Sequence, residues 1–362
     1  MNKILINRSD AIGDLILTFP VATWIKKHMP NTKVGFIVRP GHSFFKEMTT
    51  SVDEIFEIPQ TMGLFKSFMV YRKIFQEFTP DVFVQIGGNK WGSFFAFLFR
   101  IKNRLGLKNK ILSFIFLNNG IRQSRSLALM HETEYNIGLL NPLFPDFVFN
   151  QFDEIVKESY SFPTYRKEEG LALIKQIIPT ELNNKIICVI HPGMTGHSLN
   201  WSARNYARLA QTIINKYENV EIIFSYTPSD KEFIKTVKEQ LGCSENQPPS
   251  RMNFFDGSKV GLPNFVKFLS AVDFYIGGST GPTHLAGILG IPFITIFSPI
   301  RTQSAFRWHP LNLGQKFKVI TPDVVCGEDQ YCAGRQCPYF DCMGKIEVKD
   351  VFDQFSLILD NQ

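Results

Sequence analysis

The sequence predicts an α/β protein with two doubly wound domains, each built on a parallel sheet with helices on both faces. The chain has 362 residues, which exceeds the size at which one hydrophobic core usually stops growing. Short β-branched or aromatic runs alternate with segments of helical length, and the alternation restarts in the second half. Between the two series, residues 141–163 carry three Pro and no clear period, which is typical of a linker.

The first series predicts four strands, at residues 3–7, 33–38, 53–58 and 81–86. Residues 64–78 fit a period of 3.6 and predict a helix between the last two strands. We expect the first domain to span residues 1–164.

The second series predicts four more strands, at residues 185–190, 220–225, 272–276 and 293–297. An amphipathic helix is expected from about Arg204, and residues 348–359 predict one terminal helix. The second domain is expected at residues 165–345, followed by the terminal helix within 346–362. Ligands of open parallel sheets bind beyond the carboxyl ends of the strands, so we expect the chemistry in the loops that follow them.

Composition indicates a globular protein, with 44% apolar and 20% charged residues. The N-terminal stretch MNKILINRSD carries charges and lacks the apolar region of a secretory signal. No apolar run approaches the ~20 residues needed to span a bilayer. We therefore expect a cytoplasmic protein with its six Cys reduced. The formal charge of +6 suits an anionic substrate or membrane surface and is too modest to argue for nucleic acid.

The loop after the first strand reads NRSDAIGDLILTFP, residues 7–20. Gly13 allows a tight turn, and Asp14 opens the following helix, which places its carboxylate near the helix N-terminus. Such an Asp is a candidate general base for a hydroxyl group. The alternative is that Asp14 only caps the helix.

Two loops of the second half are candidate phosphate sites. HPGMTGHSLNWSARNYARLA, residues 191–210, offers backbone N–H and hydroxyl donors, although an ordinary strand-to-helix turn explains it equally well. GGSTGPTHLAGILG, residues 277–290, is the stronger signal. There Ser279 or Thr280 can cap a helix whose N-terminus favours an anion. His284, one turn further in, either faces the ligand or packs against the sheet.

Residues 100–125 hold seven Lys or Arg and no acidic residue, interleaved with an apolar run at 111–117. Such a surface suits a phosphorylated, acidic glycolipid at the inner membrane face. The alternative is a solvated helix with snorkelling Lys side chains. Nucleic acid is a poor interpretation, because no nucleic-acid-binding motif accompanies the charge.

The C-terminal cysteines Cys326, Cys332, Cys337 and Cys342 follow the spacing C-x5-C-x4-C-x4-C. No C-x2-C knuckle is present, so the spacing does not by itself indicate a structural zinc site, and metal binding stays open.

The three loops, in this order, together with MHETEYNIGLL at residues 130–140 and the terminal Cys342–Met343, resemble the family-9 glycosyltransferases. The best-known members are ADP-heptose:lipopolysaccharide heptosyltransferases. The resemblance implies a GT-B fold, in which two Rossmann-like domains with parallel sheets face a central cleft. The first domain would bind the acceptor and the second the nucleotide sugar, and the C-terminal helix would return to the first. It also implies inversion at the anomeric carbon, with no metal and no cofactor.

The resemblance also implies roles for particular residues. The catalytic base falls on Asp14. Donor contacts fall on Gly193, Met194, Thr195, Ser279, Thr280, Gly281 and His284. On the acceptor side we expect Gly13, Lys90, Arg104, Arg122 and His131 to contribute.

Two positions depart from the family pattern. Leu199 stands where members usually carry Lys, so dipoles, Arg204 or Arg301 would have to meet the diphosphate charge. Ser279 stands where many heptosyltransferases carry Asp, which leaves the sugar open.

The sequence therefore favours an inverting, membrane-associated enzyme that extends the lipopolysaccharide core, most simply from ADP-heptose to a lipid A–Kdo type acceptor. A GT-B protein that binds nucleotide sugar without turnover and a sugar-nucleotide epimerase are the alternatives. The nucleotide, the acceptor hydroxyl and the oligomeric state stay open.

Overall fold

A computed structural model describes residues 2–59, 61–89, 91–144, 151–162, 165–178, 181–194, 196, 198–243, 249–314, 316–326 and 332–361. The chain forms two compact units, and each is described here by itself. Unit 1 comprises Met1–Arg125 and Leu129–Phe162, and unit 2 comprises Ser126–Ala128 and Pro163–Gln362.

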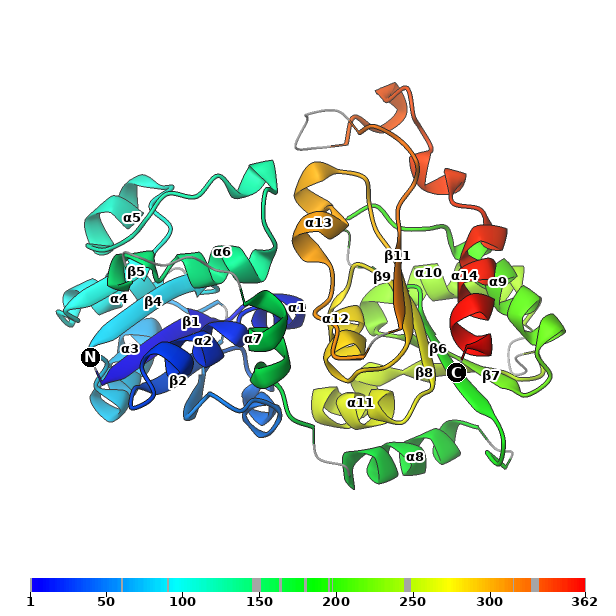
Figure 1. Ribbon diagram of the computed structural model, residues 1–362, viewed down its shortest axis with the longest axis horizontal. Coiled ribbons are helices and arrows are strands. Elements are labelled where there is room, and N and C mark those ends of the chain that lie inside the picture. The colour runs from blue at the N-terminus through cyan, green and yellow to red at the C-terminus, as the bar shows by residue number, and fades with distance from the viewer. Residues whose placement is uncertain are drawn as a thin grey trace. The chain divides into compact units, whose positions relative to one another are not determined.

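Unit 1 is built on a parallel sheet that has five strands within the described residues, in the order β3-β2-β1-β4-β5. The strands are β1 (Lys3–Arg8), β2 (Lys33–Val38), β3 (Glu54–Glu57), β4 (Val82–Gly87) and β5 (Asn103–Gly106). The helices are α1 (Ile12–Ile16), α2 (Pro20–His28), α3 (Leu64–Phe78), α4 (Trp91–Leu98), α5 (Ile111–Phe116), α6 (Glu132–Gly138) and α7 (Phe152–Ser159) (Figure 1).

Unit 2 is built on a second parallel sheet, with six strands in the described part of the chain, in the order β11-β10-β9-β6-β7-β8. The strands are β6 (Ile186–His191), β7 (Val220–Tyr226), β8 (Met252–Asp256), β9 (Phe274–Gly278), β10 (Phe293–Ile296) and β11 (Phe317–Ile320). The helices are α8 (Tyr165–Ile177), α9 (Ala203–Lys216), α10 (Lys231–Gln240), α11 (Gly261–Ser270), α12 (Gly281–Ile288), α13 (Ala305–Trp308) and α14 (Val348–Asp360).

Short 3-10 helices occur in the connections of both units. They are η1 (Ser43–Met48), η2 (Arg125–Leu127), η3 (Asn141–Leu143), η4 (Pro228–Asp230), η5 (Gly257–Lys259), η6 (Arg301–Gln303), η7 (Gly334–Gln336) and η8 (Cys342–Lys345). No helix of the described residues is long and apolar enough to cross a membrane.

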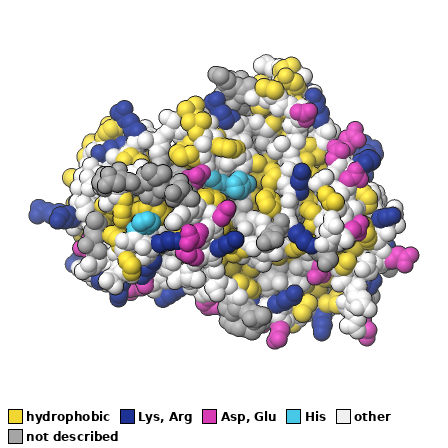
Figure 2. Space-filling model, viewed as in Figure 1, with side chains coloured by type: hydrophobic (Ala, Val, Ile, Leu, Met, Phe, Trp, Pro, Cys, Tyr) yellow, Lys and Arg dark blue, Asp and Glu magenta, His cyan; other side chains and the backbone are white. Residues whose placement is uncertain are grey.

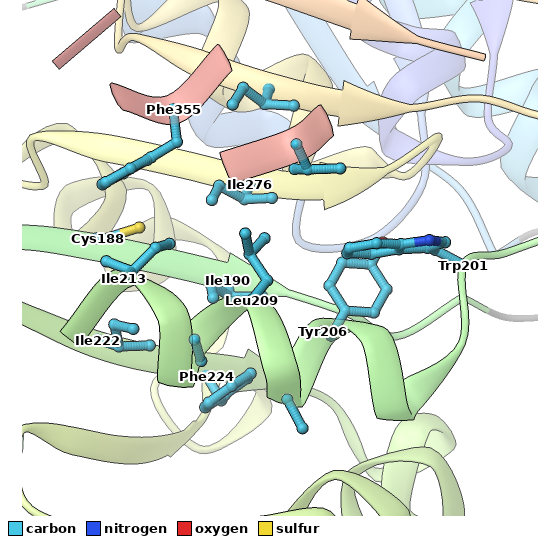
Figure 3. Close-up of a cluster of buried hydrophobic side chains, with 14 of the residues drawn as sticks. Cys188, Ile190, Trp201, Tyr206, Leu209, Ile213, Ile222, Phe224, Ile276 and Phe355 are labelled. Atoms are coloured by element: carbon cyan, nitrogen blue, oxygen red, sulfur yellow. The ribbon is translucent and has the colours of Figure 1, made fainter. Parts of the chain in front are cut away.

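The cores follow from the apolar periodicity of the sequence. In unit 1, α3 buries Tyr71, Phe75 and Phe78 at helical spacing against the sheet, together with Phe83 of β4. In unit 2, α9 packs Tyr206 against the fully buried Trp201 (Figure 3). Each side chain of this size removes enough apolar surface from water to contribute about 1.5–3 kcal/mol.

Both sheets have a switch point, where neighbouring strands send their connections in opposite directions along the sheet. In unit 1 the switch lies between β1 and β4, and in unit 2 between β6 and β9. Loops at the carboxyl ends of two such strands diverge and leave a crevice for a ligand. The order in unit 2 is that of dinucleotide-binding sheets, with β6 as the first strand.

The α/β class with two parallel sheets is confirmed, and β2, α3 and α9 lie where the sequence predicts them. Strands β5, β8 and β11 were not predicted. They are short, and on each at least two side chains are only partly buried, so their sequences lack the apolar run of a central strand.

One segment differs from expectation. Residues 141–163 are not a plain linker, because they contain α7, which buries Ile155 and Val156 and packs on α2. The terminal helix α14 packs within unit 2, and its return to the first domain stays a prediction. Val351, Phe355 and Leu359 lie one turn apart and join the core of unit 2, so α14 packs there against α9.

Candidate functional site

The candidate base, Asp14, lies on α1 directly after β1. Ala11 occupies the N-cap position of α1, and no side chain caps that helix, so Asp14 is not its cap. Its carboxylate instead accepts a hydrogen bond from Nη2 of Arg8 and keeps 26% of its side chain exposed. Asp14 is thus held in place and still open to a substrate.

Arg8 is the centre of a cluster of charges that we call the Arg8 cluster. The guanidinium is 4% exposed, and its Nε lies 3.0 Å from Oδ1 of Asp10. Its Nη2 lies 3.9 Å from Oε1 of Glu132, which in turn pairs with Nη1 of Arg125 at 2.6 Å. A buried guanidinium needs such partners, because an unpaired charge costs several kcal/mol.

The Arg8 cluster combines charges of both signs. In the described part of the chain, two guanidinium groups lie among its three carboxylates. Burial raises the pKa of Asp10 to about 6, helped by the charge on Asp14 and opposed by Arg8. Burial disfavours the charge on Arg8, but the three carboxylates outweigh it and hold its pKa above the ordinary value.

The backbone of the loop after β4 lies directly against the Arg8 cluster. A Cβ atom on Gly87 would lie 2.4 Å from Oδ2 of Asp10 and 2.8 Å from Nη1 of Arg8. Gly88 has φ +79° and lies against Ser9, whose hydroxyl accepts a hydrogen bond from the N–H of Asn89 at 2.9 Å. Only glycine allows this approach, so the β1 and β4 loops form one surface at the switch point.

The expected acceptor residues do not gather in one place. Gly13 is buried in α1, and His131 is the buried N-cap of α6, where its Nδ1 accepts from the N–H of Thr133. Arg104 donates from Nε to the carbonyl of Phe116 at 2.7 Å. Arg122 is exposed above the ring of Phe114, and Lys90 lies outside the described residues.

In unit 2 the two candidate phosphate loops meet at the switch point between β6 and β9. Met194, after β6, reaches Gly278 at the end of β9, where a Cβ atom would lie 2.8 Å from the Met194 Cε. Asn200 ties down the first loop, because its side chain donates to the carbonyl of Pro192 at 2.7 Å. Gly193 lies against Asp230, and Thr195 lies outside the described residues.

The second loop leads into α12, whose first turn starts at Gly281. Thr280 is the N-cap, but its side chain accepts no capping hydrogen bond from the backbone N–H groups of the first turn. Its hydroxyl lies 3.3 Å from that of Thr283, which donates to the carbonyl of Gly278 at 2.5 Å. The uncapped first turn, with half-buried Ser279 beside it, can accept an anion.

Two histidines lie behind these loops. His191 is buried and its Nδ1 lies 2.9 Å from the hydroxyl of Ser225; burial lowers its pKa to about 4. His284 is 5% exposed, and burial together with the charge on His309 lowers its pKa to about 4. The Nδ1 atom of His284 has no hydrogen-bond partner among the described residues. Both rings are therefore neutral at pH 7 and bring no positive charge.

The cysteines are free thiols. Burial and nearby Asp341 raise the pKa of Cys342, with smaller contributions from the other three C-terminal thiols. Sγ of Cys332 accepts the N–H of Gly334 at 3.3 Å. Among the described residues, no three His, Cys, Asp or Glu side chains are arranged to hold a metal ion.

Sequence reasoning missed Arg8, Asp10, Glu132 and Arg125. Arg8 and Asp10 both follow the end of the predicted first strand. Two charged residues at the carboxyl end of a strand are a signal of a functional site that could have been used. Glu132 and Arg125 carry no comparable local signal. Glu132 reaches Arg8 only through the fold, across more than a hundred residues of chain, and Arg125 joins the cluster through Glu132.

Comparison with known sequences shows that this chain is similar to glycosyltransferases. The profile of glycosyltransferase family 9 (heptosyltransferase) matches residues 147–321. A Haemophilus influenzae protein, named only as a glycosyltransferase, is 26% identical over 319 residues that cover 86% of this chain and 87% of that protein. The lipopolysaccharide heptosyltransferase 1 of Campylobacter coli is 22% identical over 344 residues, or 91% of this chain and 94% of its own.

Solved structures share the fold over the whole chain. The Escherichia coli ADP-heptose lipopolysaccharide heptosyltransferase II superposes with a TM-score of 0.74 at 16% identity, covering 100% of this chain and 99% of that chain. A family-9 glycosyltransferase of Veillonella parvula gives the same TM-score and identity, with 98% of that chain covered. The GT-B fold that the sequence resemblance implies is therefore confirmed.

Proposed function

Because the chain is a family-9 glycosyltransferase-like protein, we propose that it transfers heptose from ADP-heptose to the inner core of lipopolysaccharide. Unit 1 binds the acceptor and unit 2 the nucleotide sugar. The transfer inverts the anomeric carbon and needs neither a metal ion nor a cofactor. The observation that carries the proposal is the partly exposed carboxylate of Asp14, held by Arg8 at the carboxyl end of β1.

In the proposed reaction, Asp14 is the general base. It takes the proton of an acceptor hydroxyl while that oxygen forms a bond to the anomeric carbon of the donor. The bond from this carbon to the diphosphate oxygen breaks, and its electron pair leaves with the nucleoside diphosphate. A positioned base of this kind contributes about 10²–10⁴ in rate.

The Arg8 cluster supports this role for Asp14. Arg8 fixes the direction of the carboxylate, but it shares its charge with Asp10 and Glu132. Arg8 thus orients Asp14 while its own charge is shared among three carboxylates.

On the donor side, the dipoles of backbone N–H groups stabilise the negative charge of the diphosphate. The uncapped first turn of α12, with Ser279, Thr280 and Gly281, receives the departing diphosphate. Gly193, Met194 and Thr195 contact the same group from the β6 loop. His284 is neutral, so it serves as a hydrogen-bonding or packing group and not as a cation.

On the acceptor side, the partner is an acidic glycolipid of the lipid A–Kdo type. Gly13, Lys90, Arg104, Arg122 and His131 are the residues proposed to contribute to its site. The enzyme works in the cytoplasm, in peripheral contact with the inner face of the cytoplasmic membrane. Nucleic acid is no partner in this proposal.

The test compares wild type with Asp14→Asn, which keeps the shape of the side chain and removes the base. Turnover of ADP-heptose with a heptose-free lipopolysaccharide acceptor should fall by about 10²–10⁴. The thermal shift produced by ADP-heptose should be unchanged, because binding to unit 2 is untouched. A control, Asp53→Asn, removes a carboxylate paired to Lys26 away from the Arg8 cluster.

Other outcomes would reject the proposal in distinct ways. A thermal shift with UDP- or GDP-sugars and none with ADP compounds would exclude the ADP-heptose donor. Binding without any turnover would identify a non-catalytic sugar-nucleotide-binding protein. Epimerised donor, formed without acceptor, would identify an epimerase.

A further inference from the structure

Helix α5 of unit 1 presents an apolar surface to solvent. None of its six residues is buried. Ile111 is 83% exposed, Leu112 62%, and Ile115 56%. A soluble protein rarely leaves neighbouring large aliphatic side chains this open without a partner. We call these three residues, with Phe114 at 47% and with Phe97 and Leu98 of the adjoining α4, the α5 patch.

The α5 patch also carries positive charge. Residues 100–125 hold seven Lys or Arg and no Asp or Glu, of which Arg125 lies in the Arg8 cluster and is paired with Glu132. Two of these cations stack on aromatic rings of the patch, Arg122 over Phe114 at 5.1 Å and Arg104 over Phe97 at 5.5 Å. In Figure 2, hydrophobic and Lys or Arg side chains lie side by side in the part of unit 1 where Figure 1 labels α5.

The combination of exposed apolar side chains and cations favours one kind of binding partner for the α5 patch. Exposed apolar side chains with cations on two of their rings, in a chain segment without acidic residues, match the interface of an anionic bilayer, where acyl chains meet negative headgroups. A helix of six residues spans only about 9 Å, so it can lie in that interface and cannot cross the membrane. A protein partner would equally accept the apolar side chains, but it would not require the cations that lie over Phe97 and Phe114.

We propose that the α5 patch inserts into the headgroup region of an anionic membrane and holds unit 1 on its surface. The evidence for this proposal is the exposure of the apolar side chains of the α5 patch and the positive charge beside them. The proposal rests on the proposed function only in that membrane docking would bring unit 1 to a lipid-linked acceptor.

The direct test is sedimentation with vesicles of phosphatidylethanolamine and phosphatidylglycerol, against vesicles of pure phosphatidylcholine. Wild type should bind the anionic vesicles more strongly, and added salt should weaken the binding. The triple variant Ile111→Ser, Leu112→Ser and Ile115→Ser should partition at least about tenfold less, because it loses most of the inserted apolar surface.

A matched control replaces equally exposed apolar residues elsewhere. Phe306, Val325 and Leu357 of unit 2 are 62%, 80% and 57% exposed, and changing all three to Ser should leave partitioning within about twofold. Because the α5 side chains are already in solvent, the α5 variant should unfold at the wild-type temperature. That result would separate lost docking from lost folding.

Three results would overturn the inference. They are equal binding of wild type to both kinds of vesicle, an α5 variant that binds as wild type does, and a concentration-dependent dimer that the α5 variant abolishes. The last would assign the patch to a second copy of the chain. Turnover on a delipidated acceptor distinguishes the two proposals: docking without any turnover would reject the proposed function alone.

Discussion

The raised pKa of Asp10 can be tested by Asp10→Asn, which keeps the side-chain shape and removes the titrating group. Burial and the nearby charge on Asp14 raise this pKa to about 6, against 3.8 for an unperturbed aspartate. A folded-state pKa above the unfolded value means that the fold favours the protonated carboxyl. The ionised carboxylate therefore lowers the free energy of unfolding at neutral pH.

The sign and size of the effect follow from linkage. Stability contributed by protonated Asp10 is fully present below pH 3.8 and is lost as the pH rises through about 6. At 1.36 kcal/mol per pH unit, the separation corresponds to about 3 kcal/mol. The free energy of unfolding of Asp10→Asn, relative to wild type, should increase over this window by up to about 3 kcal/mol and then stay constant.

Two measurements check this prediction. The ¹³C NMR shift of the Asp10 carboxyl should titrate with a midpoint near 6, and urea unfolding of both proteins from pH 4 to 8 should give the difference in stability. Asp81→Asn is a control of opposite sign. The Asp81 carboxylate accepts the N–H of Asn2 at 2.7 Å, and this bond lowers its pKa, so removal should destabilise most at neutral pH.

A midpoint below about 4.5, or a stability difference that does not change with pH, would refute the proposed environment of Asp10. The titration of Asp10 should also change the pH dependence of the transferase activity. When Asp10 takes a proton, the Arg8 cluster loses one negative charge near Asp14, so the acidic limb of the pH–rate profile should move in Asp10→Asn.

Three further changes test other contacts. Gly87→Ala should cut transferase activity by more than about tenfold without altering nucleotide binding, because its Cβ would lie 2.4 Å from Oδ2 of Asp10. Glu132→Gln should lower the free energy of unfolding by about 3 kcal/mol, measured by urea titration, since the buried guanidinium groups lose a shared partner. Trp201→Phe should cost about 1–3 kcal/mol in the same assay, because the carbonyl of Ile346 loses the indole N–H at 2.9 Å.

Much of the fold could be predicted from sequence because central strands and long helices carry strong periodic patterns. β2 and α3 begin and end at the predicted residues. β11 could not be predicted, since it lies at the edge of its sheet and two of its four residues are exposed. The helix α7 was missed because prolines around it suggested a linker, although its apolar residues pack onto α2.

The sequence could predict those parts of the candidate site whose residues lie close together in the chain. Gly13 and Asp14 follow a strand directly, and the loop before α12 combines glycines with hydroxyl side chains. The support for Asp14 was not predictable. Glu132 reaches Arg8 only when α6 packs onto α2, and no spacing in the sequence encodes that distance.

The end of unit 1 has a consequence for recombining this enzyme with relatives. Tyr160, just beyond α7, donates its hydroxyl hydrogen bond to the carbonyl of Ile16, on the same short helix as Asp14. Ser159 bonds to Thr23 at 2.8 Å. A chimaera that exchanges unit 2 should therefore be spliced after Phe162, since an earlier junction would replace the native support of α1, which carries Asp14.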